Sequence, residues 1–128
     1  MFYLLDTNIL VYAKMAAMRE HQRVSSWLAD AVSDPVAEIL LCETSILAFL
    51  RISTNVKIFD PPLDLEDARD YLTNFLSMDS VSIFSLTAQH FSDVADIGLN
   101  NKMSGKHIMD AHLATIALNT GATLVTRD

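Results

Sequence analysis

The sequence has few of the residues that break or cross-link a chain. Its 128 residues include only 3 Gly, 3 Pro and 1 Cys. The scarcity of Gly and Pro argues against long disordered stretches. The single Cys42 excludes an internal disulfide and a cysteine zinc cluster, and it fits a reducing compartment. The length suits one compact domain, so we expect a single domain over residues 1–128.

Basic residues are also scarce. Lys and Arg number 9 against 16 Asp and Glu, which gives a formal net charge of -7. This balance argues against tight nonspecific binding of nucleic acid through a general positive field. It does not exclude a nuclease, because carboxylates that await a divalent cation lower the formal charge and the bound cation reverses the local sign. An acidic chain could also be masked by a basic partner.

Long apolar runs are absent from the sequence. No run approaches the roughly 18 residues that a membrane-spanning helix requires. The apolar segment Phe2 to Leu5 is interrupted at once by Asp6, and no basic residue precedes it, so it does not resemble an export signal. The expectation is therefore a cytoplasmic protein.

The chain instead alternates short apolar runs with longer segments of helical periodicity. Strands are expected at 2–5, 39–41, 81–84 and 122–125, and helices at 8–14, 20–32, 45–52, 65–76, 88–99 and 107–119. Thr87 is expected to cap a helix, and Gly121 stands where a helix C-terminal stop is expected. Short strands separated by helices imply an α/β fold with a parallel sheet covered on both faces.

Three acidic residues stand out by their positions in this pattern. Asp6 follows the first strand, Asp128 follows the last, and Asp110 lies near the start of the helix before that last strand. In an open parallel sheet, ligands gather beyond the carboxyl ends of the strands, so the three carboxylates are expected at one edge. Oxygen ligands favour Mg²⁺ or Mn²⁺, which can activate water against a phosphodiester. The spacing alone leaves open that each Asp is a turn residue or a helix cap.

Local motifs resemble those of the PIN-domain family, and in particular its VapC-type toxins. The opening segment YLLDTNILVYA, which contains Asp6, resembles the first strand and metal-ligand Asp of that family. The family's closing helix, turn and strand are similar to DAHLATIALNTGATLVTRD, which carries Asp110 and Asp128. The segment FLRISTN, which begins at Phe49, resembles a segment that recurs in one branch of these toxins. The resemblance covers nearly the whole chain in the right order, and the two end motifs together are specific.

The resemblance implies a three-layer α/β/α fold with a central, mostly parallel sheet. It also implies endoribonuclease activity dependent on Mg²⁺ or Mn²⁺, with Asp6, Asp110 and Asp128 as metal ligands, and inhibition by a cognate antitoxin. Asn8 and Thr126 fall at polar positions near the family's carboxylates, which suggests supporting hydrogen bonds. Their alternative roles are a helix start and a strand-end hydroxyl.

The sequence departs from the family pattern at one position. Many PIN domains carry a Glu in the helix after the second strand, where this chain has Ala48. The nearest acid is Glu43, and two residues that far apart on one helix differ by roughly 140° in direction. Glu43 therefore replaces the missing acid only if it lies at the strand end, just before the helix. We count it as a candidate catalytic residue, with helix capping as the alternative.

Other ionisable residues are weaker candidates. His107, Asp110 and His112 suggest a metal site, but residues at i and i+2 do not share a helix face. His112 is expected to touch substrate or to pack, and His21 and His90 are expected at surface or amphipathic positions. Four basic residues lie near the proposed active edge and could hold RNA phosphates, although each could equally be ordinary surface charge: Arg51, Lys102, Lys106 and Arg127.

Asp93 and Asp96 share one helix face at i and i+3, and we expect that face to be solvated rather than to support the cleft. No Ser-His-Asp or Cys-His motif and no glycine-rich nucleotide loop is recognisable.

Two other functions fit parts of the pattern. A PIN domain with weak or lost catalysis would bind RNA or an antitoxin, and Ala48 is its best support. A phosphoacceptor receiver domain is also small and acidic, but Asp79 precedes a strand and no Lys follows Lys106. We further expect a homodimer and an antitoxin peptide to use an exposed apolar surface around Val24 and Trp27.

Overall fold

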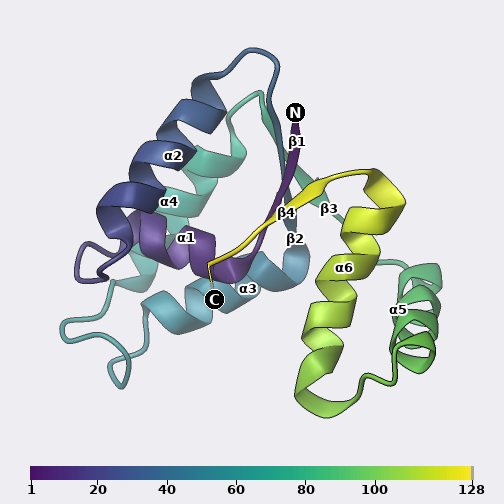
Figure 1. Cartoon of the computed structure of the whole chain (residues 1–128). Coiled ribbons are helices and arrows are strands. Elements are labelled where there is room, and N and C mark those ends of the chain that lie inside the picture. Colours follow the sequence, from purple (N-terminus) through teal and green to yellow (C-terminus); the bar gives the residue numbers. More distant parts are fainter. Residues whose placement is uncertain (128) are drawn as a thin grey trace.

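Four parallel strands form the centre of the molecule in the computed structural model, which describes residues 1–127 (Figure 1). Their order across the sheet is β3-β2-β1-β4. Each neighbouring pair is parallel, so all four carboxyl ends lie at the same edge. The strands are β1 (Phe2–Leu5), β2 (Glu38–Cys42), β3 (Val81–Phe84) and β4 (Thr123–Val125).

Helices cover both faces of this sheet, which confirms the predicted α/β/α architecture (Figure 1). One face is covered by α1, α2, α3 and α4, and the other by α5 and α6. The helices are α1 (Thr7–Lys14), α2 (His21–Ser33), α3 (Glu43–Ser53), α4 (Leu65–Leu76), α5 (Ala88–Asn100), the short 3₁₀ helix η1 (Gly105–His107) and α6 (Ile108–Thr120).

The alternating direction of the side chains along each strand explains why helices cover both faces of the sheet. Leu5, Ile39 and Leu41 are buried against the first group of helices. Leu4 and Leu40, one residue earlier on each strand, are buried against α6 on the other face. Because successive side chains of a strand point to opposite faces, runs that are apolar throughout require a helix layer on each side.

Two helix ends follow directly from local sequence. The Thr87 hydroxyl accepts a hydrogen bond from the His90 backbone N–H at 3.2 Å and so caps α5. Gly121 ends α6 with φ of 76°, in the left-handed region that a residue with a Cβ disfavours. Both ends confirm the sequence-based prediction.

The structure corrects one prediction about burial. Val24 is buried, with 7% of its surface exposed, so an exposed apolar surface around Val24 does not form. Of the surface and amphipathic positions expected for His90, the structure shows an amphipathic one, where His90 is 3% exposed on the same stripe of α5 as the buried Val94 and Gly98. That stripe repeats every four residues, and the repeat was the sequence signal for the burial of His90. Across the described residues, no helix is long and apolar enough to cross a membrane.

Candidate active site at the carboxyl edge of the sheet

Asp6 lies where β1 ends and α1 begins, at the carboxyl edge of the sheet. Its backbone N–H donates to the Val125 carbonyl at 3.0 Å, which continues the pairing of β1 with β4. One carboxylate oxygen, Oδ1, accepts from the Thr7 backbone N–H at 2.6 Å and caps α1. The other, Oδ2, accepts from the Thr126 hydroxyl at 2.8 Å. Both bonds fix the orientation of the Asp6 carboxylate and leave lone pairs on each oxygen for another ligand.

Asn8 and Thr126 extend this arrangement. The Asn8 amide Nδ2 donates to the Thr126 hydroxyl oxygen at 3.3 Å, and the Asn8 carbonyl Oδ1 accepts from the Arg127 backbone N–H at 3.4 Å. The start of α1 is therefore tied to the segment that follows β4. Residues from opposite ends of the sequence thus hold one carboxylate in place.

A cleft of about 240 Å³ opens beside Asp6. Asp110, in the first turn of α6, lines the same cleft. The structure therefore brings together two of the predicted site residues, which lie near opposite ends of the chain. The other lining residues come from α1, α3 and α6, and they are Thr7, Thr44, Ser45, Ala48, Arg51, Ile52, Met109, His112 and Leu113.

Helix α3 presents one face to this cleft. Thr44, Ala48 and Arg51 recur at helical spacing along that face. Ala48 thus stands on the cleft wall, at the position where the family resemblance led us to expect an acid. Glu43 is the first residue of α3 and is not among the residues that line the cleft. As an acid in the first turn it has a favourable interaction with the helix dipole.

The third predicted metal ligand, Asp128, lies outside the described residues. Within residues 1–127, no three Asp, Glu, His or Cys side chains come together as a metal-binding group. The Asp6 and Asp110 pair still fits Mg²⁺, which is commonly bound by one or two carboxylates together with waters and substrate phosphates.

A chain of hydrogen bonds runs from the cleft into the interior. His112 Nε2 lies 2.8 Å from the Thr44 hydroxyl, and His112 Nδ1 lies 2.7 Å from His90 Nε2. The Thr44 hydroxyl donates to Cys42 Sγ at 3.3 Å. Its oxygen then accepts from His112 Nε2–H, and His112 Nδ1 accepts from His90 Nε2–H. In this assignment both rings are neutral, and α3, α5 and α6 are joined at the cleft wall.

Burial, and to a lesser extent the neighbouring His90, lowers the pKa of His112 below its ordinary value. His112 is 6% exposed, so a charged imidazolium there would lose its hydration. His90 Nδ1 is buried with no hydrogen-bond partner among residues 1–127, as expected for the accepting end of the chain. Sequence reasoning missed this pairing, because it depends on how α5 packs against α6.

The remaining candidates lie elsewhere or play other parts. His107 Nδ1 is 3.7 Å from the Asp110 carboxylate, an ion pair when the imidazole is protonated. Asp93 accepts from Gln89 and from Asn119, so it joins α5 to α6 and does not line the cleft. Of the four basic residues expected near the active edge, Arg51 lines the cleft.

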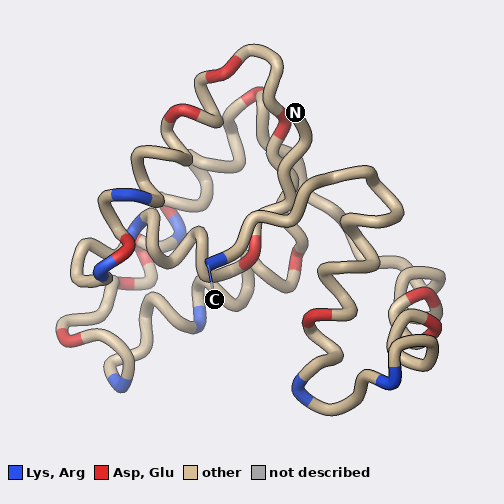
Figure 2. Tube along the Cα trace, in the orientation of Figure 1, with Lys and Arg blue, Asp and Glu red and all other residues tan. Residues whose placement is uncertain are grey.

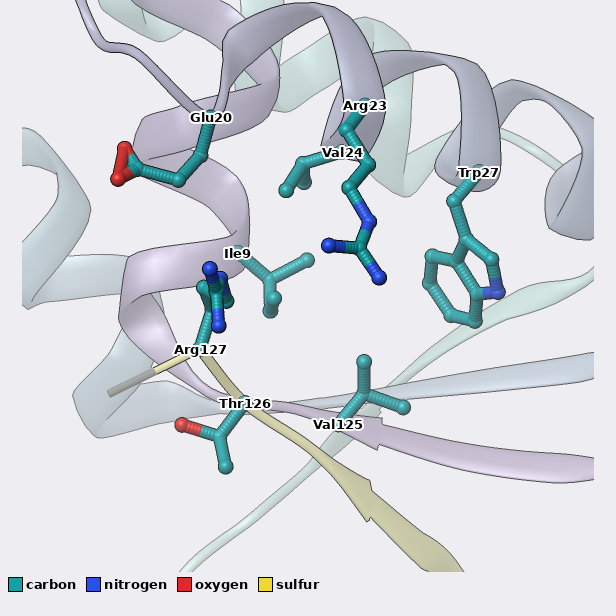
Figure 3. Close-up of a pocket in the computed structure, with 8 residues that line it drawn as sticks. All are labelled: Ile9, Glu20, Arg23, Val24, Trp27, Val125, Thr126 and Arg127. Atoms are coloured by element: carbon teal, nitrogen blue, oxygen red, sulfur yellow. The ribbon is translucent and has the colours of Figure 1, made fainter.

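A second pocket, of about 200 Å³, is lined by residues of α1, α2 and the end of β4 with the segment after it (Figure 3). Ile9 and Val125 form its apolar floor, and Trp27 forms one wall. The guanidinium groups of Arg23 and Arg127 face the space between these walls (Figure 3). We call this the Trp27 pocket; its remaining lining residues are Glu20, Val24 and Thr126.

Charge is distributed unevenly over the molecule. Figure 2 shows Lys and Arg in the half that contains the carboxyl ends of the strands, whereas the end around the N-terminus shows only acidic charged positions. At that acidic end, Asp34, Glu38 and Asp79 line a concavity beside the starts of β2 and β3. The basic residues therefore gather in the half around the cleft, where acidic residues are also present.

Comparison with known proteins agrees with this geometry. A family model described as the PIN domain matches residues 3–128. The chain belongs to the PIN-domain family. It is 32% identical over 124 residues to ribonuclease VapC43 of Mycobacterium tuberculosis, across 96% of this chain and 83% of that protein. It is 30% identical over 125 residues to ribonuclease VapC33 of the same species, across 96% and 85% of the two chains.

Solved structures show the same PIN fold. Mycobacterium tuberculosis VapC20, a toxin that cleaves the sarcin-ricin loop, superposes with a TM-score of 0.74 at 13% identity, over 98% of this chain and 89% of that one. VapBC2 from Rickettsia felis, bound to a DNA fragment of its promoter, superposes with a TM-score of 0.64 at 22% identity, over 100% and 88%.

Proposed function

We propose that this chain is a metal-dependent endoribonuclease that acts as the toxin of a toxin–antitoxin pair. The observation that carries the proposal is the meeting of Asp6 and Asp110 in one cleft at the carboxyl edge of a parallel sheet. The named ribonuclease activity of its VapC relatives supports RNA as the substrate. The buried free Cys42 fits action in the reducing cytoplasm.

Asp6 and Asp110 would hold Mg²⁺ or Mn²⁺, and Asp128 is a further candidate for the site. The bound ion would supply an activated water and stabilise charge on the phosphodiester. The chain's own residues prepare the site for this. Thr126 and the Thr7 N–H hold the Asp6 carboxylate in one orientation, and Arg51 places a positive charge on the cleft wall for an RNA phosphate.

The test is RNA cleavage by the Asp6→Asn variant. Asn keeps an oxygen to accept from the Thr7 N–H, so the cap of α1 and the fold are expected to persist. Cleavage is expected to fall by about a hundredfold or more, because losing even an outer partner of a metal site costs about 10–100-fold. Asp96→Asn, which removes an exposed charge from α5, is the matched control and should leave cleavage unchanged. Full activity of Asp6→Asn, or of the wild type in excess EDTA, would exclude the mechanism.

A second candidate is a PIN domain that binds RNA or an antitoxin and cleaves weakly. Ala48 on the cleft wall favours it, because one carboxylate expected from the family pattern is absent there. The two candidates differ in their response to Mn²⁺. A nuclease should gain cleavage with rising Mn²⁺, and a binding module should bind RNA without cleaving it.

We propose a cognate antitoxin as the partner, supported by structural neighbours solved as VapBC complexes. We also propose a homodimer. Its support is a group of exposed apolar side chains along α3, the segment after it and the start of α4, namely Leu47, Val56, Ile58 and Leu65.

A further inference from the structure

The Trp27 pocket combines features that neither the fold nor the catalytic cleft requires. Arg23 and Trp27 lie one turn apart on α2, so both side chains reach the same space. Arg127 approaches from the segment after β4, on the opposite side of the pocket (Figure 3). Two cations therefore stand over an apolar floor, and the Arg23 guanidinium lies between Arg127 and the indole ring (Figure 3).

Neither arginine is neutralised by the part of the chain that the structure describes. Within residues 1–127, Arg23 and Arg127 form no ion pair, and both are exposed. Glu20 also lines the pocket, but its carboxylate lies at the opposite end from Trp27 and is 4.0 Å from Arg19 Nε (Figure 3). In a chain with net charge -7, two cations without carboxylate partners among residues 1–127 favour an anionic ligand.

The pocket also adjoins the cleavage cleft. Asp6 and Thr7 line the cleft, whereas Ile9 lines the Trp27 pocket two residues further along α1. Thr126 lines the pocket and donates to the Asp6 carboxylate at 2.8 Å. A strand of RNA whose phosphate lies at Asp6 can therefore continue into the Trp27 pocket.

We propose that the Trp27 pocket binds one nucleotide of the RNA strand next to the phosphate in the cleft, an inference that rests on the proposed ribonuclease function. The base stacks on the indole of Trp27 above Ile9 and Val125, and the phosphates flanking that base bind Arg23 and Arg127. Stacking on an aromatic ring tolerates every base, since each has a π face, so the pocket holds RNA without selecting sequence. An acidic peptide would satisfy the arginines but would leave the indole face without a planar partner.

Trp27 itself supplies the direct measurement, because it is the only Trp of the chain. The full-length Asp6→Asn variant, in which cleavage is blocked, is titrated with a six-nucleotide single-stranded RNA of mixed sequence. A base stacked on the indole is expected to quench Trp27 emission saturably. Poly-glutamate is titrated in parallel as a polyanion that has no bases.

Substitutions of the arginines test the phosphate contacts. In the same background, Arg23→Gln and Arg127→Gln should each weaken RNA binding about five- to tenfold and reduce the slope of log affinity against log salt by about 0.7. The matched control is Arg69→Gln on α4, which removes an exposed Arg that pairs with Asp70 outside both pockets. It should leave the affinity and the salt slope unchanged.

Substitutions of Trp27 test stacking with labelled RNA, followed by anisotropy. Trp27→Leu should weaken binding and Trp27→Phe should restore most of it. Circular dichroism checks the fold of each variant, because Trp27 also packs edge-on against Tyr3, with ring centroids 5.2 Å apart.

The possible results distinguish a failure of the Trp27 pocket assignment from a failure of the ribonuclease proposal. Unchanged affinity in both Gln variants, or flat Trp27 emission while RNA binds, would overturn the assignment and leave the ribonuclease proposal intact. Displacement of RNA by poly-glutamate with equal quenching would also overturn it, by showing that the pocket accepts an acidic protein segment. If the wild type neither binds nor cleaves RNA, the proposed function fails first and the inference falls with it.

Discussion

At the scale of residues, Thr44 connects the cleft to the interior. Its hydroxyl lies on the cleft wall and bonds to His112, which bonds in turn to the buried His90. Such a chain is stable only when each donor meets an acceptor, because an unpaired buried polar group costs about 1–3 kcal/mol. The two histidines therefore fix the orientation of a cleft hydroxyl, His112 from the cleft wall and His90 from the interior.

The His112→Gln variant tests this chain. The Gln amide can still donate to Thr44 but no longer accepts from His90, so the free energy of unfolding should fall by about 1–3 kcal/mol at neutral pH. Burial holds the folded-state pKa of His112 below its ordinary value. At a pH between the folded-state and the unfolded-state pKa of His112, the unfolded wild type binds a proton that the folded protein does not bind. The stability of the wild type is therefore complete above the unfolded-state pKa and falls as the pH decreases toward the folded-state pKa.

The stability gap between wild type and His112→Gln should therefore narrow as the pH falls, as measured by denaturant titration across a pH series. His107→Gln, at an exposed histidine of η1, is the control and should show a small gap without that narrowing. A gap that widens at acid pH would contradict the neutral, buried assignment of His112.

At the scale of elements, α3 determines how many carboxylates reach the cleft. Its cleft-facing side carries Thr44, Ala48 and Arg51, while Glu43 lies at its first position. The structure begins this helix at Glu43, two residues before the predicted start, and so makes Glu43 helical. Within one helix, the angle between Glu43 and Ala48 directs the two side chains apart.

Substitutions of Ala48 and Glu43 distinguish the role of the cleft face of α3 from the role of its first residue. Ala48→Glu should add a carboxylate to the cleft and lower the Mn²⁺ concentration needed for half-maximal cleavage by about tenfold. This size is expected because a change of one partner of a metal site alters metal affinity or activity by about 10–100-fold. Glu43→Gln should change cleavage by less than about threefold and lower stability by about 0.3–1 kcal/mol, through the helix dipole. Cleavage is measured across a Mn²⁺ titration. A hundredfold loss in Glu43→Gln would instead place Glu43 in the site.

The elements were largely predictable from the sequence, and the reason is periodicity. The helix over 65–76 and the strand over 81–84 match α4 and β3 because their apolar spacing admits no other structure. The meeting of Asp6 and Asp110 followed from the rule that parallel strands share a carboxyl edge. The burial of Val24 and the pairing of His90 with His112 were not predicted, because each depends on packing between helices.

At the scale of the whole molecule, one group of exposed apolar side chains lies on α3, the start of α4 and the segment between them. Val56 and Ile58 are 66% and 51% exposed in the segment between these helices. We expect a dimer through this surface, which Val56→Asp should dissociate by placing a charge in an apolar interface. Multi-angle light scattering measures the mass. The control is Val36→Asp, at an equally exposed Val beside the start of β2, and it should remain dimeric. A wild-type monomer at high concentration would refute the prediction.

The uneven charge gives the molecule an electric dipole directed along the strands. A polyanion that diffuses toward the acidic end is repelled, and the torque on the protein turns the half that carries the Lys and Arg toward the incoming strand (Figure 2). Encounters are thereby oriented before any contact forms. The torque weakens as ions screen it over a Debye length of about 8 Å at physiological salt. Rotational steering thus lets a chain of net charge -7 present the carboxyl edge of its sheet first to a nucleic acid.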